Sequence, residues 1–561
     1  MPSARSHLWP LVALASLFLL TPTNAANLAA WKSRSIYQTM TDRFARTDNS
    51  TTHACKLSDG LYCGGTWQGT INQLDYIQGM GFDAVMISPI IENVHGQVSY
   101  GEAYHGYWPL DLYSLNSHFG THDDLLRLSE ALHARGMFLL MDVVVNNMAY
   151  ILEDDGDPAR DIDYSTLTPF NDSSYYHPYC KISDWNNYTN AQNCQTGDLE
   201  VVLPDLYTEH AEVQNILTRW AKQTIETYSI DGLRLDAAKH VDTGFLRNFV
   251  SSLAADTFVT GEVLERDVGI VCNYQDKYIG SMPNYPIYFS MLEALVNATT
   301  VSLFKEVEYM KASCVDVNAL VSFSENHDQE RIPVKNKDIA IAKNVITFTM
   351  LFDGIPMIYQ GQEQHLSGGN NPQNREAIWL TGYKTDAVLY KLFGTLNTLR
   401  KHVIRLGADY LDSATAPIYR DDGALAFKKG IEGRHVVMLL STQGSTQASE
   451  FTLGLKVAYN AGTDVTEILH CTNHTVADNG EMVVSMDKGE PRVFFPTSLM
   501  GGSGLCGWAP ANVTLAELKT GEVPASASMA RASGARAVKR AGVGGFVVLT
   551  MMAAACSMMG F

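Results

Sequence analysis

Short runs of apolar and β-branched residues alternate with amphipathic stretches between about Ser33 and Arg400. Stretches such as 123–135 repeat apolar residues with a helical period, and the runs between them have the length of buried strands. The candidate strands are 82–88, 137–145, 232–236, 258–262, 321–325 and 356–359. This alternation predicts parallel strands joined by crossover helices.

Polar residues stand where these predicted strands end, as Asn146, Asp236, Glu262 and Asp328 do. An open doubly wound sheet binds its ligand at one switch point, whereas a (β/α)8 barrel gathers side chains from many strand ends on one face. No glycine-rich phosphate loop follows the first strand, which argues against a dinucleotide fold. We therefore predict an α/β protein with a (β/α)8 TIM barrel.

The alternation is interrupted once and then replaced. Residues 148–209 are polar and rich in Asp, Asn and Tyr, so we expect an inserted domain after the third strand, with the barrel formed by 27–147 and 210–407. Residues 408–508 show short alternating segments at 424–428, 435–440 and 492–495, which predict a C-terminal antiparallel β-sandwich. The Ala-, Ser- and Gly-rich stretch 509–542 predicts a flexible stalk that contains the anchor attachment region.

Both ends of the chain carry processing signals. Residues 1–26 combine Arg5, an apolar stretch and the small residues Ala25 and Ala26, which predicts a cleavable secretory signal. Residues 543–561 lack charge, but the basic residues lie before them and none follows, the reverse of a spanning helix. Small residues at 533–535 favour a tail removed on attachment of glycosylphosphatidylinositol (GPI). We expect a secreted protein held at the cell membrane or wall by a GPI anchor.

Charge and cysteine use limit the partners and the compartment. The 60 acidic against 41 basic residues give a net charge of -19, which excludes a nucleic-acid partner. We expect the protein to be a monomer.

Eight of the 9 cysteines remain once Cys556 leaves with the tail, and eight cysteines allow 105 connectivities. Spacing favours the local pairs Cys55–Cys63, Cys180–Cys194, Cys272–Cys314 and Cys471–Cys506. N-glycosylation sequons begin at Asn49, Asn171, Asn187, Asn297, Asn473 and Asn512.

Three acidic residues at strand ends are the candidate catalytic groups: Asp236, Glu262 and Asp328. Retaining cleavage of a glycoside needs two carboxyl groups about 5 to 5.5 Å apart, one as nucleophile and one as acid and then base. Each residue alone could as well be a carboxylate that caps the next helix. Their joint occurrence favours a glycosidase.

The segments around these carboxylates, together with Asp142-Val-Val-Val-Asn146 and Tyr104-His-Gly-Tyr-Trp108, resemble the conserved regions of the α-amylase family of glycoside hydrolases (family 13). The resemblance runs from about Trp31 to Cys506. It is closest to fungal α-amylases, including the surface-anchored α-amylase/4-α-glucanotransferase type. It implies endo-acting, retaining cleavage of α-1,4-glucans or maltooligosaccharides, with Asp236 as nucleophile, Glu262 as acid/base and Asp328 orienting the sugar.

The resemblance also implies a set of substrate contacts. Tyr107 is expected to stack on the sugar, Lys239 and His240 to lie toward the leaving group, and Arg375 to contact glucan farther along the cleft. The full expected set is His105, Tyr107, Trp108, Asn147, Arg234, Lys239, His240, His327 and Arg375. Arg234 lies two residues before Asp236 on one strand and so on the same face, where its charge should lower the pKa of Asp236 and keep it ionised.

A calcium ion between barrel and insertion is implied by the same resemblance. Asn146, Asp205 and the main-chain carbonyl of His240 occupy the matching positions, and Gln192 stands where the family has Glu. Because an amide offers an oxygen without a charge, we expect weaker calcium binding than in typical relatives.

Asn147 departs from the family motif, which has His at this position. Asn cannot carry charge and reaches less far, so stabilisation of the distorted sugar should fall by about a few kcal/mol at most. The leading interpretation is α-amylase-type cleavage with substantial 4-α-glucan transfer, serving cell-wall α-glucan. The alternatives are a 4-α-glucanotransferase with weak hydrolysis and an inactive glucan-binding wall protein. The complete acid set with Arg234 and His327 argues against the inactive protein.

Overall fold

The computed structural model describes residues 26–153, 155–255, 257–445 and 451–511 of the 561-residue chain. The predicted secretory signal up to residue 25, residues 512–542 of the stalk and the hydrophobic tail lie outside these ranges, and their processing stays a prediction. Within these ranges no helix combines the length and the hydropathy that a membrane span requires.

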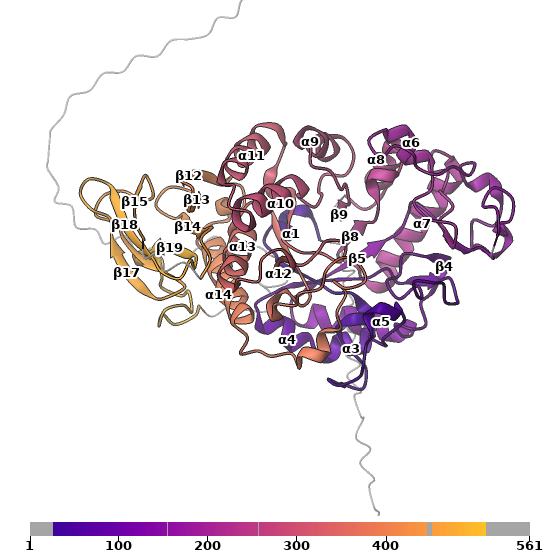
Figure 1. The fold of residues 1–561 in the computed structure, drawn as a ribbon, viewed down its shortest axis with the longest axis horizontal. Coiled ribbons are helices and arrows are strands. Elements are labelled where there is room, and N and C mark those ends of the chain that lie inside the picture. The colour runs from indigo at the N-terminus through magenta and orange to yellow at the C-terminus, as the bar shows by residue number, and fades with distance from the viewer. Residues whose placement is uncertain (1–25, 154, 256, 446–450, 512–561) are drawn as a thin grey trace, which may run out of the picture. The chain divides into compact units, whose positions relative to one another are not determined.

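The barrel is built from seven parallel strands in the order β10-β11-β1-β2-β5-β8-β9, with helices outside them (Figure 1). Their bounds are β1 Ile36–Gln38, β2 Ala84–Ile87, β5 Phe138–Val143, β8 Gly232–Leu235, β9 Phe258–Gly261, β10 Val321–Ser322 and β11 Ile355–Tyr359. Residues 281–283 close the gap, because Gly261 N donates to Ser281 O (3.0 Å) and Val321 N donates to Met282 O (2.9 Å). The predicted (β/α)8 barrel is confirmed.

Amphipathic helices connect the strands and cover the barrel. Thr121 and Asp124 form a capping box at the start of α5, and the helix buries Leu125, Leu128 and Leu132. The larger helices are α3 Trp67–Asn72, α4 Leu74–Gly79, α5 His122–Ala134, α7 Ala211–Tyr228, α8 Thr243–Ser252, α9 Val268–Lys277, α10 Tyr285–Met291, α11 Thr300–Ser313, α13 Ile339–Leu351 and α14 Val388–Leu406. The helix predicted at 123–135 is thus present with its bounds moved by one residue.

Irregular chain fills the stretch between β5 and α7. It contains the antiparallel strands β6 (Tyr150–Ile151) and β7 (Val201–Val202) and the helix α6 (Tyr188–Asn193). Helix α6 packs against the short helix η4 (Ala238–His240), which follows β8. The insertion therefore contacts the barrel beside the strand that carries Asp236.

The C-terminal strands form two antiparallel sheets, as the alternating pattern predicts. The larger has the order β12-β13-β14-β19-β16-β17 and the smaller pairs β15 with β18. Apolar side chains such as Leu439 and Phe494 from one sheet share a core with Leu455 and Val484 from the other. The bounds are β12 Ala416–Arg420, β13 Ala424–Lys429, β14 Val436–Ser441, β15 Phe451–Lys456, β16 Asp464–Glu467, β17 Thr472–Thr475, β18 Glu481–Met486 and β19 Arg492–Pro496.

All four predicted disulfides are present. They join Cys55 to Cys63, Cys180 to Cys194, Cys272 to Cys314 and Cys471 to Cys506. Each closes a local loop, the longest spanning 42 positions. The local spacing therefore selected the right pairing among the formal alternatives.

Candidate active site

Strand register brings the candidate carboxylates to one rim of the barrel. Asp142 on β5 lies opposite Arg234 on β8, and Leu235 lies opposite Gly261 on β9. The backbone pairing continues one residue further, since Asp236 N donates to Val143 O (2.9 Å) and Glu262 N donates to Leu235 O (2.8 Å). Asp236 and Glu262 therefore leave neighbouring strands at the same level.

One guanidinium joins three carboxylates at this rim. Arg234 Nη1 lies 2.9 Å from Asp142 Oδ2 and 2.8 Å from Asp236 Oδ1, and its Nη2 lies 2.8 Å from Glu262 Oε2. The Arg234 side chain is 6% exposed, against 17% for Asp236 and 14% for Glu262. The two predicted catalytic carboxylates thus remain partly exposed while the cation between them is buried.

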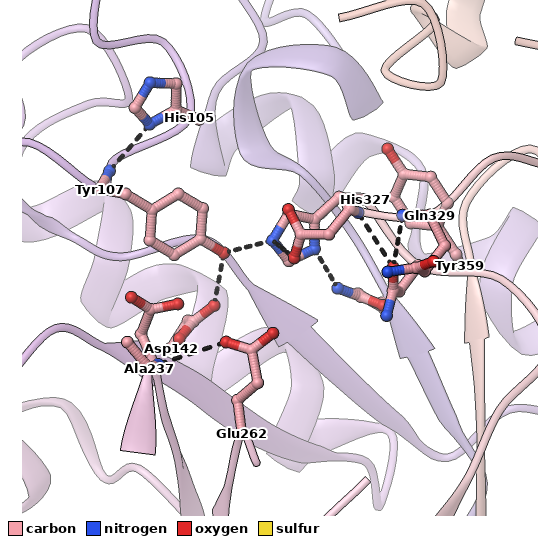
Figure 2. A network of polar contacts seen from close by, with 12 residues as sticks. His105, Tyr107, Asp142, Ala237, Glu262, His327, Gln329 and Tyr359 are labelled. Atoms are coloured by element: carbon pink, nitrogen blue, oxygen red, sulfur yellow. Dashed lines mark hydrogen bonds and ion pairs between the residues drawn. The ribbon is translucent and has the colours of Figure 1, made fainter. Parts of the chain in front are cut away.

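Asp328, the third of the predicted catalytic acids, is connected to this group by His327 and Tyr107. His327 Nε2 lies 3.2 Å from Asp328 Oδ2 and 2.8 Å from the Tyr107 hydroxyl, which donates to Asp142 Oδ2 (2.7 Å). Figure 2 shows Tyr107 between His327 and Asp142, with Glu262 beside them. On its other side Asp328 Oδ1 accepts from Arg375 Nη2 (3.2 Å). The structure therefore brings all three predicted acids into one polar network.

The charge balance of the rim differs from the sequence prediction. Burial raises the pKa of Asp236 well above its ordinary value, and Glu262, Asp142 and Asp328 act in the same direction. Arg234 lowers this pKa, as predicted, but does not outweigh burial. The predicted lowering by Arg234 is therefore present, but the net pKa of Asp236 is raised and not lowered as expected, because burial outweighs the guanidinium. The physical reason is first the burial of the Asp236 carboxyl, which disfavours its charged form, and then the neighbouring carboxylates that share the one cation.

Two buried histidines at the rim are held neutral. Burial lowers the pKa of His105 and of His327 well below the ordinary value, and Arg375 acts in the same direction on both. His105 Nδ1 accepts from the Tyr107 backbone N–H (3.0 Å), and the His105 ring meets Trp108 edge-on at 4.7 Å. Both rings can therefore offer or accept hydrogen bonds without carrying charge.

Lys239 and His240 lie on the side of the insertion. Lys239 Nζ is 3.2 Å from Glu265 Oε2, which also accepts from the Tyr188 hydroxyl (3.2 Å). His240 Nδ1 lies 3.0 Å from the carbonyl of Ala191 in α6. Their predicted place on the leaving-group side stays a hypothesis, and the contacts show that both are fixed against the insertion.

Asn147 and Arg375 are engaged with protein groups. Asn147 is 4% exposed, and its Nδ2 donates to the carbonyl of Met148 (3.1 Å). Arg375 contacts Asp328 directly and donates through Nε to the carbonyl of His327 (3.1 Å). Arg375 therefore supports the third carboxylate, and the predicted glucan contact farther along the cleft stays a hypothesis.

The residues expected to bind calcium meet in two pairs. Asn146 O accepts from Leu206 N (2.9 Å), which brings Asn146 next to Asp205, and η4 with His240 packs against α6 with Gln192. Asp205 Oδ1 is buried and has no hydrogen-bond partner among the described residues. Within the described ranges no group of three or more His, Cys, Asp or Glu side chains is arranged for a metal. A set of amide and carbonyl oxygens with one carboxylate nevertheless suits a hard cation such as Ca²⁺.

The predicted site set left out two residues that the structure adds. Asp142 binds both Arg234 and Tyr107. The feature of the sequence that could have identified it is its position in the predicted strand 137–145, at the start of the Asp142–Asn146 motif. The Tyr285 hydroxyl lies 3.5 Å from Glu262 Oε1 and accepts from Asn326 Nδ2 (3.1 Å). Tyr285 follows segment 281–283, whose short sequence carries no strand pattern that could have placed it.

Comparison with known proteins follows the same division of the chain. Residues 38–388 match the model "Alpha amylase, catalytic domain", and residues 417–514 match "Alpha-amylase, domain C". Alpha-amylase 1 of Schwanniomyces occidentalis is 42% identical over 85% of this chain and 92% of its own length. Alpha-amylase 1 of Lipomyces kononenkoae is 45% identical over 86% of this chain and 76% of its own length.

Among solved structures, an alpha-amylase from Malbranchea cinnamomea superposes with a TM-score of 0.81 at 43% identity, covering 86% of this chain and 100% of its own. An alpha-amylase from Geobacillus thermoleovorans, solved in complex with acarbose, superposes with a TM-score of 0.68 at 26% identity, covering 83% and 98%. The similarity therefore includes the barrel and the C-terminal sheets together.

Proposed function

The chain belongs to the alpha-amylase family, and we propose that its barrel rim cleaves α-1,4-glucosidic bonds of starch-like glucans with retention of configuration. The observation that carries this proposal is the contact of one buried guanidinium, Arg234, with both Asp236 and Glu262 at 2.8 Å. A retaining glycosidase needs two carboxyl groups that reach one anomeric carbon. Carboxylates that share a guanidinium are close enough for that task.

The reaction runs in two displacements. Asp236 attacks the anomeric carbon and forms a glycosyl ester, while Glu262 gives its proton to the glycosidic oxygen, which leaves as the 4-hydroxyl of the departing chain. Glu262, now a carboxylate, then takes a proton from water or from an incoming sugar hydroxyl as that oxygen attacks the same carbon. The ester bond to Asp236 breaks, and both carboxyl groups return to their first state.

Neighbouring groups hold the two carboxyl groups in position. Ala237, in the left-handed conformation (φ 49°), directs its N–H to Glu262 Oε2 (3.2 Å). The Arg234 charge favours ionised Asp236, while Asp328 and neutral His327 face the sugar hydroxyls. Because burial raises the pKa of Asp236, the acidic limb of the pH–rate profile should lie above the ordinary carboxyl range.

We further propose substantial 4-α-glucan transfer. Asn147 donates its amide to the Met148 carbonyl, so this side chain gives the sugar less support than a charged or longer one would. The glycosyl ester still forms, since Asp236 and Glu262 are intact. The product is then decided by whether water or a second glucan occupies the acceptor side, near Lys239 and His240. A role in cell-wall α-glucan metabolism would follow from transfer by an anchored enzyme.

Calcium and processing complete the proposal. Asn146, Gln192, Asp205 and the His240 carbonyl would hold Ca²⁺, which when bound supplies a charge that ties the insertion (148–209) to the barrel. Glutamine in place of a carboxylate weakens this site.

We propose a secreted monomer with the barrel at 27–147 and 210–407 and a C-terminal domain at 408–508, anchored through GPI. Export is supported by the four disulfides.

Product analysis with maltopentaose tests the function. Hydrolysis alone yields only shorter maltooligosaccharides, whereas transfer also yields maltohexaose and longer products. Asp236→Asn should abolish both, because it removes the nucleophile. A wild-type protein that binds maltopentaose without converting it would be an inactive glucan-binding protein and would refute the proposal.

A further inference from the structure

Gln38, the last residue of β1, contacts the ring of His327 from a distant part of the chain. Its amide Nε2 lies 2.8 Å from His327 Nδ1 across 289 positions of sequence. The Gln38 side chain is buried, and its Oε1 has no hydrogen-bond partner among the described residues. The amide therefore meets the ring through its N–H group.

The contacts on the other side of the His327 ring indicate independently which ring nitrogen carries the hydrogen. Tyr107 donates its one hydroxyl hydrogen to Asp142 Oδ2 (2.7 Å), and both Asp142 oxygens also accept from Arg234 Nη1 at 2.9 Å. The Tyr107 oxygen can then only accept from His327 Nε2, 2.8 Å away. A neutral imidazole with hydrogen on Nε2 has a lone pair on Nδ1, which is what the Gln38 amide needs.

We propose that Gln38 is a positioning residue that holds His327 in the neutral tautomer with its proton on Nε2. This inference rests on the proposed glucan cleavage, because that N–H lies beside Asp328, 3.2 Å away, where the sugar is expected. An amide N–H against Nδ1 also opposes the imidazolium form, in which two donors would face each other. Without it, only the Tyr107 oxygen would hold the hydrogen on Nε2, and Nδ1 would lose the donor that opposes its protonation.

The groups around the ring make this control necessary. Burial, Arg375 and Arg234 lower the pKa of His327, whereas Glu262 raises it. The titratable and charged groups that face the ring from its own loop and from neighbouring elements are His105, Tyr107, Arg234, Glu262, Asp328, Tyr359 and Arg375. Gln38 adds a fixed dipole that does not titrate, so its preference for an unprotonated Nδ1 does not change with pH.

Two variants at Gln38 and one control separate positioning from packing. Gln38→Met removes the amide at similar volume, and Gln38→Glu places an acceptor against Nδ1. The control is Gln360→Met at the end of the adjacent strand β11, where the Gln360 side chain is buried and its Oε1 accepts from Met40 N (2.9 Å). Nitrogen NMR of [15N]histidine-labelled protein reports the tautomer, with the His327 signals assigned by their loss in His327→Gln.

In the wild type we expect His327 Nδ1 unprotonated and Nε2 protonated. Gln38→Met should lower kcat on maltopentaose by about 2- to 10-fold, the loss of one neutral hydrogen bond, with a smaller change in KM. In Gln38→Glu, neutral His327 places its hydrogen on Nδ1, and Nε2–H returns only on protonation. Activity of this variant should therefore need a protonated His327. Its kcat/KM should begin to fall, as pH rises, at a lower pH than in the wild type. Gln360→Met should leave the His327 signals and the shape of the pH profile unchanged.

A wild-type ring protonated on Nδ1 would overturn the proposal, as would equal effects of Gln38→Met and Gln360→Met with unchanged His327 signals. The NMR measurement needs no substrate. If the wild type cleaves no glucan, the proposed function fails while the tautomer assignment is still decided.

Discussion

Two buried charge clusters in this molecule differ in the balance between their cations and their carboxylates. At the barrel rim Arg234 contacts Asp142, Asp236 and Glu262, and the side chains of the two predicted catalytic carboxylates remain 14–17% exposed. Beneath the C-terminal sheets, Lys429 Nζ pairs with Asp353 (2.5 Å), and their side chains are 4% and 3% exposed. The rim has too few cations for its acids, whereas the second cluster is balanced.

The balanced cluster is also fully hydrogen-bonded. Lys429 donates to Asn318 Oδ1 (2.6 Å) and to the carbonyl of Ser413 (2.8 Å), and Asp353 accepts from the backbone and hydroxyl of Thr415 (2.8 Å each). These contacts join β13 to the chain that precedes β11. Buried charges that only stabilise a fold are paired and hydrogen-bonded, whereas an unbalanced and partly exposed set of charges indicates a functional site.

Asp236→Asn should have the largest effect on activity and the least on folding. Loss of the nucleophile should reduce kcat on maltopentaose by about 10⁴-fold or more. Because the change removes one of several crowded carboxylates, the thermal unfolding midpoint should stay the same or rise. A large fall in the midpoint would mean that the rim is a structural cluster like the one at Lys429.

Lys429→Met should show the reverse. It leaves Asp353 buried and without its cation, which costs about 3–5 kcal/mol in the free energy of unfolding. Chemical denaturation measures this loss, and kcat of the protein that remains folded should be unchanged. The double variant Lys429→Met/Asp353→Leu is the control, because removal of both charges should recover part of the stability. A fall in kcat without loss of stability would contradict the comparison.

Asn147→His tests how the rim responds to a longer, titratable donor. The added imidazole should support the distorted sugar better and raise hydrolysis by about tenfold, the equivalent of one hydrogen bond. The ratio of maltohexaose to maltotriose formed from maltopentaose reports the balance of transfer and hydrolysis. An unchanged ratio and rate would remove Asn147 from the explanation of transfer. Asn147→Gln, which lengthens the amide without a titratable group, is the matched control.

Glu490→Gln should have the smallest effect, because this carboxylate is only partly buried, with 25% of its side chain exposed. His470 and Lys343 lower the pKa of Glu490 to about 2, and Glu467 and Glu490 raise the pKa of His470 to about 9. A depressed carboxyl pKa stabilises the fold above its ordinary value of 4.5, and this is lost as pH falls toward 2. A raised histidine pKa stabilises below 6.5, and this is lost as pH rises through 9. The midpoint difference from wild type should therefore be largest at about pH 5 to 6.5; a pH-independent difference would contradict this.

The sequence alone determined the barrel, the C-terminal sheets, the disulfide pairs and the family. Strand and helix periods are local properties of the chain, so a run such as 232–236 could be read directly, and β8 begins at Gly232 as predicted. Asp236 and Glu262 each follow a buried strand directly, whereas Asp328 stands beyond the end of β10 at Ser322 and was identified within the segment 323–328. Local loops closed by cysteines up to 42 positions apart needed no knowledge of the fold.

Only the tertiary structure decided how these residues act on one another. The spacing of Arg234 and Asp236 showed that they share a face. It could not show that Asp236 is buried, or that Asp142 and Glu262 use the same guanidinium, and these two features together raise the Asp236 pKa instead of lowering it. Nor could it show Gln38 against His327, 289 positions away. Electrostatic interaction depends on distance and burial, and both are set by strand order and register, which no local pattern in the chain contains.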